Sequence, residues 1–73
     1  MSLVAAIGVN ARLAGYALAG VQVHDASDDG AVRAAWESLD EDVACVILTA
    51  DAHAALAPLL GERPQMIWAV VPD

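Results

Sequence analysis

The sequence alternates regularly between short apolar runs and segments of helical composition, and this alternation most constrains the fold. Four apolar runs are predicted to be strands: Leu3–Ile7, Val21–His24, Val43–Leu48 and Met66–Val71. Three intervening segments are predicted to be helices: 11–19, 30–39, and a third that Thr49 or Asp51 caps and that continues to Leu60. Gly20 and Gly61 follow the first and third helices, where glycine commonly ends a helix.

The second predicted helix has the clearest buried face. Its apolar residues recur at the i, i+3, i+4, i+7 spacing of one helix face: Val32, Ala35, Trp36 and Leu39. The first helix instead contains Gly15, which costs about 1 kcal/mol relative to alanine inside a helix. We expect close packing against the sheet to explain this glycine.

The strands predict a parallel sheet. Residues 43–48 form an unbroken run of β-branched and aliphatic side chains, which is typical of a central parallel strand. Residues 21–24 alternate between apolar and polar side chains, which suits a strand at or near a sheet edge. Short connections and strict alternation indicate right-handed crossovers. We therefore expect residues 1–73 to form a single α/β domain with strand order 2-1-3-4, a flavodoxin-like or Rossmann-like three-layer fold with three helices.

This topology leaves part of the sheet uncovered. Right-handed crossovers place the first helix on one face and the other two on the opposite face. Flavodoxin-like domains fill the remaining place with a helix after the last strand, and the sequence encodes no such helix before its end at Asp73. One side of the third and fourth strands should be bare and apolar, which predicts a docking surface that includes Met66, Trp68 and Val70. Removal of a last helix from a longer chain would give the same pattern.

Charge excludes several classes of partner. The net charge is −7, from ten acidic residues against three arginines, with no lysine. No cationic cluster is available for nucleic acid or for anionic membrane surfaces. The single cysteine, Cys45, lies in an apolar run and is expected to be a buried small hydrophobe. No signal peptide is evident, and no apolar run approaches the roughly 20 residues of a membrane span, so a cytoplasmic protein is expected.

Groups for catalysis or cofactor binding are sparse. Polar residues that follow the first and third strands are the candidates for an enzyme or ligand site: Asn10, Arg12, Thr49, Asp51 and His53. Asp51 and His53 are two positions apart, so on a helix they point to different sides. The segment 8–12 lacks the glycine spacing of a phosphate loop, and two isolated histidines do not suggest a metal site. We expect no catalysis, no cofactor and no metal.

One segment resembles a known family. Ile7-Gly8, followed by the Leu-Ala-Gly-Tyr-Ala-Leu-Ala-Gly-Val of residues 13–21, resembles the start of the F subunit of V-type and archaeal A-type ATPases. In that family a strand ends in Ile-Gly-Asp, and the following helix carries a Gly-Phe-Arg-Leu-Ala-Gly pattern. The sequence departs at Val9, Tyr16 and Ala17, which stand at the family's Asp, Phe and Arg.

The resemblance implies a non-catalytic subunit of the central stalk, peripheral to the membrane through its assembly. It would bind the coiled-coil D subunit, with the catalytic head as a second candidate partner, and contribute to proton transport coupled to ATP hydrolysis or synthesis. Tyr16 joins Met66, Trp68 and Val70 as a partner-contact residue, while the family's C-terminal tail has no counterpart. Two alternatives stay open: a stand-alone ligand-binding domain that uses the loops after strands one and three, and a homodimer through the bare face.

Overall fold

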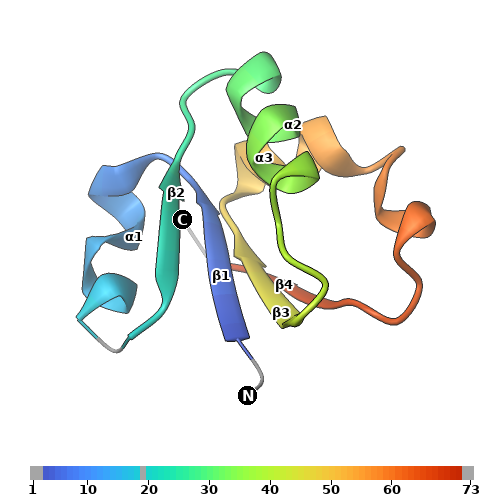
Figure 1. Ribbon diagram of the computed structural model, residues 1–73. Coiled ribbons are helices and arrows are strands. Elements are labelled where there is room, and N and C mark those ends of the chain that lie inside the picture. The colour runs from blue at the N-terminus through green and yellow to red at the C-terminus, as the bar shows by residue number, and fades with distance from the viewer. Residues whose placement is uncertain (1–2, 19, 72–73) are drawn as a thin grey trace.

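All four predicted strands form and pair in parallel in the computed structural model (Figure 1), which describes residues 3–18 and 20–71. The elements in chain order are β1 (Leu3–Gly8), α1 (Asn10–Ala17), β2 (Gln22–Asp25), α2 (Asp29–Glu37), β3 (Val43–Leu48), α3 (Ala50–Leu56), the 3₁₀ turn η1 (Leu60–Glu62) and β4 (Ile67–Val70). The strand order is β2-β1-β3-β4, which confirms the predicted α/β topology with β2 at one edge.

The register decides which side chains share a face. Ala5 pairs with Val46, and Val46 pairs with Trp68, so these three point to the same side of the sheet. Cys45 pairs with Val4 and with Ile67, and these point to the other side. We call the first side the α2/α3 face and the second the α1 face, because α2 and α3 pack together while α1 packs on β1 and β2 (Figure 1).

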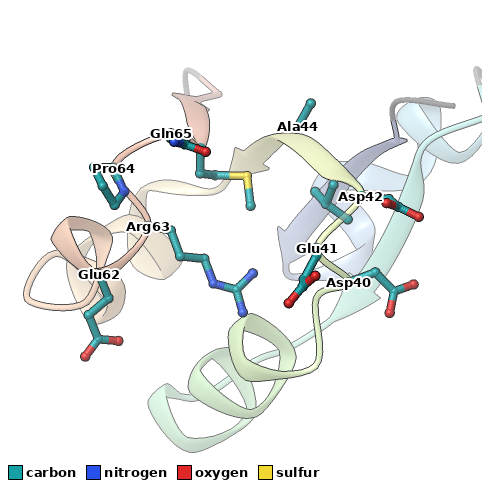
Figure 2. A pocket seen from close by; sticks show the side chains of 10 residues that line it. Asp40, Glu41, Asp42, Ala44, Glu62, Arg63, Pro64 and Gln65 are labelled. Atoms are coloured by element: carbon teal, nitrogen blue, oxygen red, sulfur yellow. The ribbon is translucent and has the colours of Figure 1, made fainter.

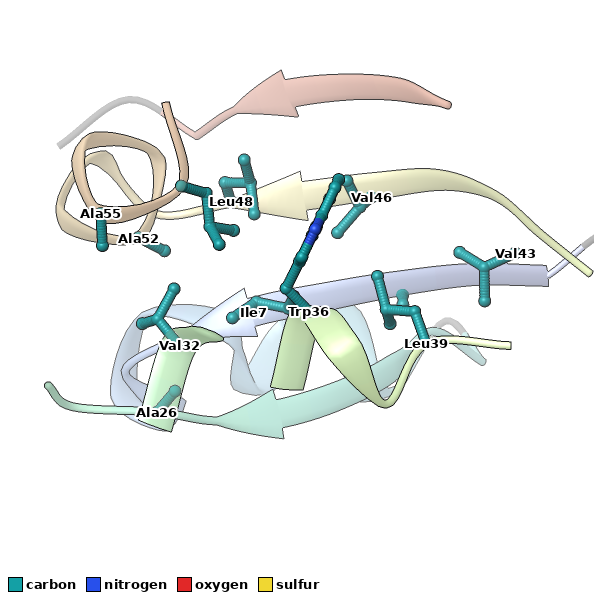
Figure 3. Close-up of a cluster of buried hydrophobic side chains, with 12 residues drawn as sticks. Ile7, Ala26, Val32, Trp36, Leu39, Val43, Val46, Leu48, Ala52 and Ala55 are labelled. Carbon is teal, nitrogen blue, oxygen red and sulfur yellow. The ribbon is translucent and has the colours of Figure 1, made fainter. Parts of the chain in front are cut away.

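The main core lies between the sheet and the α2/α3 layer. Trp36 of α2 is its largest fully buried side chain, and Figure 3 shows it extending across the sheet among Val46 and Leu48 of β3. Val32 and Leu39 are buried beside it, which confirms the predicted face of α2. Burial of a Trp side chain dominates a core otherwise built from small aliphatic groups.

The α1 face has a smaller buried centre. Leu13 of α1 and Ala6 of β1 are fully buried, and both lie outside the main cluster. Gly15 does not pack on the sheet, contrary to expectation: it is exposed, and a Cβ added there would meet nothing within 4 Å. The packing of residues 3–18 and 20–71 therefore gives no reason for this glycine.

The third helix is shorter than predicted. It ends at Leu56, and η1 follows at Leu60–Glu62. The reason is Pro58, which has no N–H to continue the helical hydrogen bonds. Of the two predicted caps, Thr49 is the N-cap, and its Oγ1 accepts a hydrogen bond from the Ala52 N–H at 3.3 Å.

The carboxyl ends of β1 and β3 approach each other closely at Gly8. This residue has φ of +153°, and a Cβ built on it would overlap the buried side chain of Thr49. The Thr49 N–H also donates to the Ile7 carbonyl at 3.3 Å, and the Ala26 N–H donates to the Gly8 carbonyl at 2.8 Å. Gly8 thus lets three chain segments meet at one point.

We predict that Gly8→Ala lowers the free energy of unfolding by about 1–3 kcal/mol, because the methyl group must displace Thr49 from its capping position and the backbone conformation suits glycine. Urea unfolding followed by circular dichroism measures the loss. Gly61→Ala is the matched control, since a Cβ there meets nothing within 4 Å. Equal stability of the two variants would contradict the close approach at Gly8.

Candidate docking surface

Half of the α1 face is bare. Five residues of β1, β3 and β4 point to the α1 face but lie outside the part that α1 covers. We call them the bare half-face: Val4, Cys45, Ile47, Ile67 and Ala69. Ile67 is 68% exposed, and Val4 and Ala69 are also exposed. Cys45 is half-buried rather than buried, because no helix lies over it among the described residues. The surface is entirely uncharged, as expected of a face that another element covers.

Helix α1 borders this surface with small and apolar residues. Ala11, Ala14 and Gly15 are exposed on it, and Leu18 at its C-cap is 92% exposed. Leu18 and Ile67 are therefore the two most exposed of the large apolar side chains described. Ile67 belongs to the bare half-face, and Leu18 ends the helix that covers the other half of the α1 face.

The predicted contact residues do not lie on the bare half-face. Trp68 and Val70 pair with Val46 and Leu48, so they point to the α2/α3 face, and the Trp68 ring lies 4.8 Å from the His53 ring of α3. This corrects the expected placement, although Trp68 is still 43% exposed and its role in partner binding stays a prediction. Trp68 and Val70 lie on this side because β4 pairs with β3 in the register that sets Trp68 beside Val46 and Val70 beside Leu48.

Met66 and Tyr16 have separate surroundings. Met66 is half-buried and packs against the main core cluster. Tyr16 is half-buried on α1, where its carbonyl accepts a hydrogen bond from the Val21 N–H at 3.2 Å. The four predicted contact residues therefore do not form one continuous patch.

The carboxyl ends of the strands, where open α/β sheets bind ligands, hold very little space. The cavity there has a volume of about 30 Å³ and is bordered by Thr49, Asp51 and the start of α2. Among the other candidates for a ligand site, His53 packs on Trp68 and Arg12 is exposed on α1, while the side chain of Asn10 lies outside the described residues.

A larger hollow lies at the opposite, amino end of the sheet. Its volume is about 770 Å³, and the loop 40–42 and the segment 62–66 line it. Figure 2 shows Arg63 extending into the hollow while Glu62 points away from it. The Arg63 guanidinium carbon lies 5.0 Å from the centre of a Trp36 ring. This cation–π contact places the guanidinium over the buried Trp36 and gives Arg63 a structural role, so an anion-binding role is not needed to explain its position. The acidic residues Asp40, Glu41 and Asp42 line one side, and the remaining lining includes the apolar Val43, Ala44, Pro64 and Met66.

Other chemistry is limited over residues 3–18 and 20–71. No cluster of three or more His, Cys, Asp or Glu side chains there is arranged to hold a metal ion. No helix in the same part of the chain has both the length and the apolarity to cross a membrane. His24 is half-buried on β2, and its Nε2 atom is buried without a hydrogen-bond partner.

Comparison of the chain with protein-family models, curated proteins and solved structures finds no match. The exposure of Ile67 and Leu18 was missed from the sequence. In β4 the residues that point to one side of the sheet and those that point to the other are all apolar. The sequence pattern therefore does not indicate which of the two groups faces α3.

We predict that Arg63→Ala lowers the free energy of unfolding by about 0.5–1 kcal/mol, because the guanidinium no longer covers the Trp36 ring. Chemical denaturation measures the change. Arg33→Ala, at an exposed position of α2, is the control and should stay within about 0.5 kcal/mol of the parent chain. If both variants lose the same stability, the contact with Trp36 is not the cause.

Proposed function

We propose that this protein is a non-catalytic docking subunit whose bare half-face binds a helical partner. The observation that carries the proposal is the apolar surface of Val4, Cys45, Ile47, Ile67 and Ala69, which continues the sheet beyond α1. A sheet face of this kind is stabilised when a helix covers it. A helix from another protein can take that place beside α1.

We further propose that the partner is the coiled-coil stalk subunit of a V-type or A-type rotary ATPase. The support is the resemblance of Ile7-Gly8 and residues 13–21 to the F subunit of those enzymes. In this role the protein would sit on the central stalk, near the catalytic head and peripheral to the membrane. It would contribute to proton transport coupled to ATP hydrolysis or synthesis without acting on nucleotide itself.

The shape of the protein favours docking over the ligand-binding alternative. A small-molecule site usually offers a cavity of roughly 300–1,000 Å³ at the carboxyl ends of the strands. The cavity at that end has about 30 Å³. The larger hollow, of about 770 Å³, has the volume of a small-molecule site but lies at the amino end, away from the usual ligand position, and its lining mixes acidic with apolar residues.

The proposal predicts that the chain co-purifies with the coiled-coil stalk subunit of its own organism, and that Ile67→Asp weakens the complex at least tenfold. A buried carboxylate facing an apolar helix without a partner charge carries a large desolvation cost. Isothermal titration calorimetry measures the affinity, and circular dichroism confirms that the variant is folded, as expected for a residue that is 68% exposed.

Trp68→Asp is the paired variant that distinguishes the two faces of β4. If the bare half-face binds the partner, Trp68→Asp should weaken binding much less than Ile67→Asp. The reverse order would place the contact on the side of β4 that holds Trp68 and Val70. Failure of the wild-type chain to bind any stalk subunit, together with specific thermal stabilisation by a nucleotide, would refute the proposal in favour of a ligand-binding domain.

A further inference from the structure

The α1 face has a shape that is complementary to itself. Helix α1 covers the half made by β1 and β2, and the half made by β3 and β4 is bare (Figure 1). A two-fold axis parallel to the strands exchanges these halves when two such faces meet. Each α1 would then lie over the β3–β4 half of the other copy, and the two helices would form one shared layer between two sheets.

The most exposed apolar side chains fit this arrangement. The crossover from β1 runs back along the sheet, so Leu18 at the C-cap of α1 lies toward the amino end of the strands. Ile67 is the first residue of β4 and lies toward the same end. A two-fold axis along the strands keeps this end in register, so Leu18 of one copy meets Ile67 of the other. Their exposures of 92% and 68% are the largest available for such a contact.

Gly15 gives an independent indication. Glycine inside a helix costs about 1 kcal/mol relative to alanine, and no contact among the described residues requires it at this position. The outer side of α1 carries Ala11, Ala14 and Gly15, all exposed. Small residues of this kind allow another backbone to approach the helix closely.

The distribution of charge permits two copies to meet on this face despite the net charge of −7. Residues 3–24 and 63–71 contain no acidic residue. Nine of the ten acidic residues lie between Asp25 and Glu62, mostly on α2, α3 and the loops, and the tenth is Asp73, outside the described residues. Among the acids of the strands, Asp25 pairs with Gly8 and points to the α1 face at the carboxyl end of β2. The acids of α2 and α3 in two copies joined through their α1 faces are separated by both sheets and the shared helical layer. That separation is well beyond the Debye length of about 8 Å at physiological salt.

We infer that the protein forms a symmetric homodimer through its α1 face when no other partner occupies it, with α1 of each copy on the β3–β4 half of the other. The dimer differs from the proposed stalk complex and excludes it, because both use the bare half-face. The inference rests on the shape and charge of that face and not on the identity of the heterologous partner.

Analytical ultracentrifugation of the wild-type chain over a concentration series is the first test. The weight-average mass should rise toward twice that of a single chain. Ile67→Asp and Gly15→Leu should each weaken self-association at least tenfold, the first by placing charge in the interface and the second by preventing close approach. Ala34→Asp, at an exposed position on α2, is the control and should dimerise like the parent. A wild-type chain that stays monomeric throughout overturns the inference.

Directed cross-linking tests the arrangement itself and does not depend on the stability of the Asp variant. In a Cys45→Ala background, a Leu18→Cys chain is mixed with an Ile67→Cys chain under mild oxidation. Within one chain these positions lie on opposite sides of the α1 face, with β4 two strands or about 10 Å from β1. The mixed disulfide should form faster than the disulfide between Ala34→Cys and Ile67→Cys chains. Equal rates would overturn the proposed geometry.

The outcome is separable from that of the proposed function. A chain that is monomeric alone yet binds the coiled-coil subunit contradicts only the homodimer. A chain that dimerises with the expected cross-link and binds no stalk subunit contradicts only the stalk role.

Discussion

Right-handed crossovers between parallel strands are the constraint on which the rest of this structure depends. The chain moves from β1 to β2 in one direction and from β2 through β3 to β4 in the other. Each crossover therefore places its helix on a definite face: α1 on one side, α2 and α3 on the other. The uneven cover of the sheet follows from this path and does not depend on any single side chain.

The two faces consequently have different energetic roles. On the α2/α3 face Trp36 fills the space between helices and sheet, and Arg63 covers its ring from outside. On the α1 face the buried centre is limited to Ala6, Leu13 and their neighbours, and the apolar surface continues beyond α1 to Ile67. A domain of this size has little stability to spare, so covering that surface by a partner or a second copy is a substantial gain.

Much of the candidate site followed from the sequence, and one part did not. The bare half of the sheet was predicted from element order and handedness, without any side-chain detail. The residues on it were placed on the wrong side, because Trp68 and Val70 were expected where Ile67 and Ala69 lie. Strand β4 is apolar at every position, so its two faces look the same in the sequence. The lack of a packing reason for Gly15 could also be recognised only once the position of α1 was known.

The sequence by itself determined the elements, their order and the parallel sheet, because strand and helix periodicities, glycine and proline are local signals. Even the error at α3 had a local cause in Pro58. Tertiary structure alone decided the pairing of Cys45 with Ile67 and of Val46 with Trp68. That register places Trp68 against His53 and leaves Ile67 in the open. Register is set by long-range contacts between strands, and a shift of one residue reverses which side chains face the core.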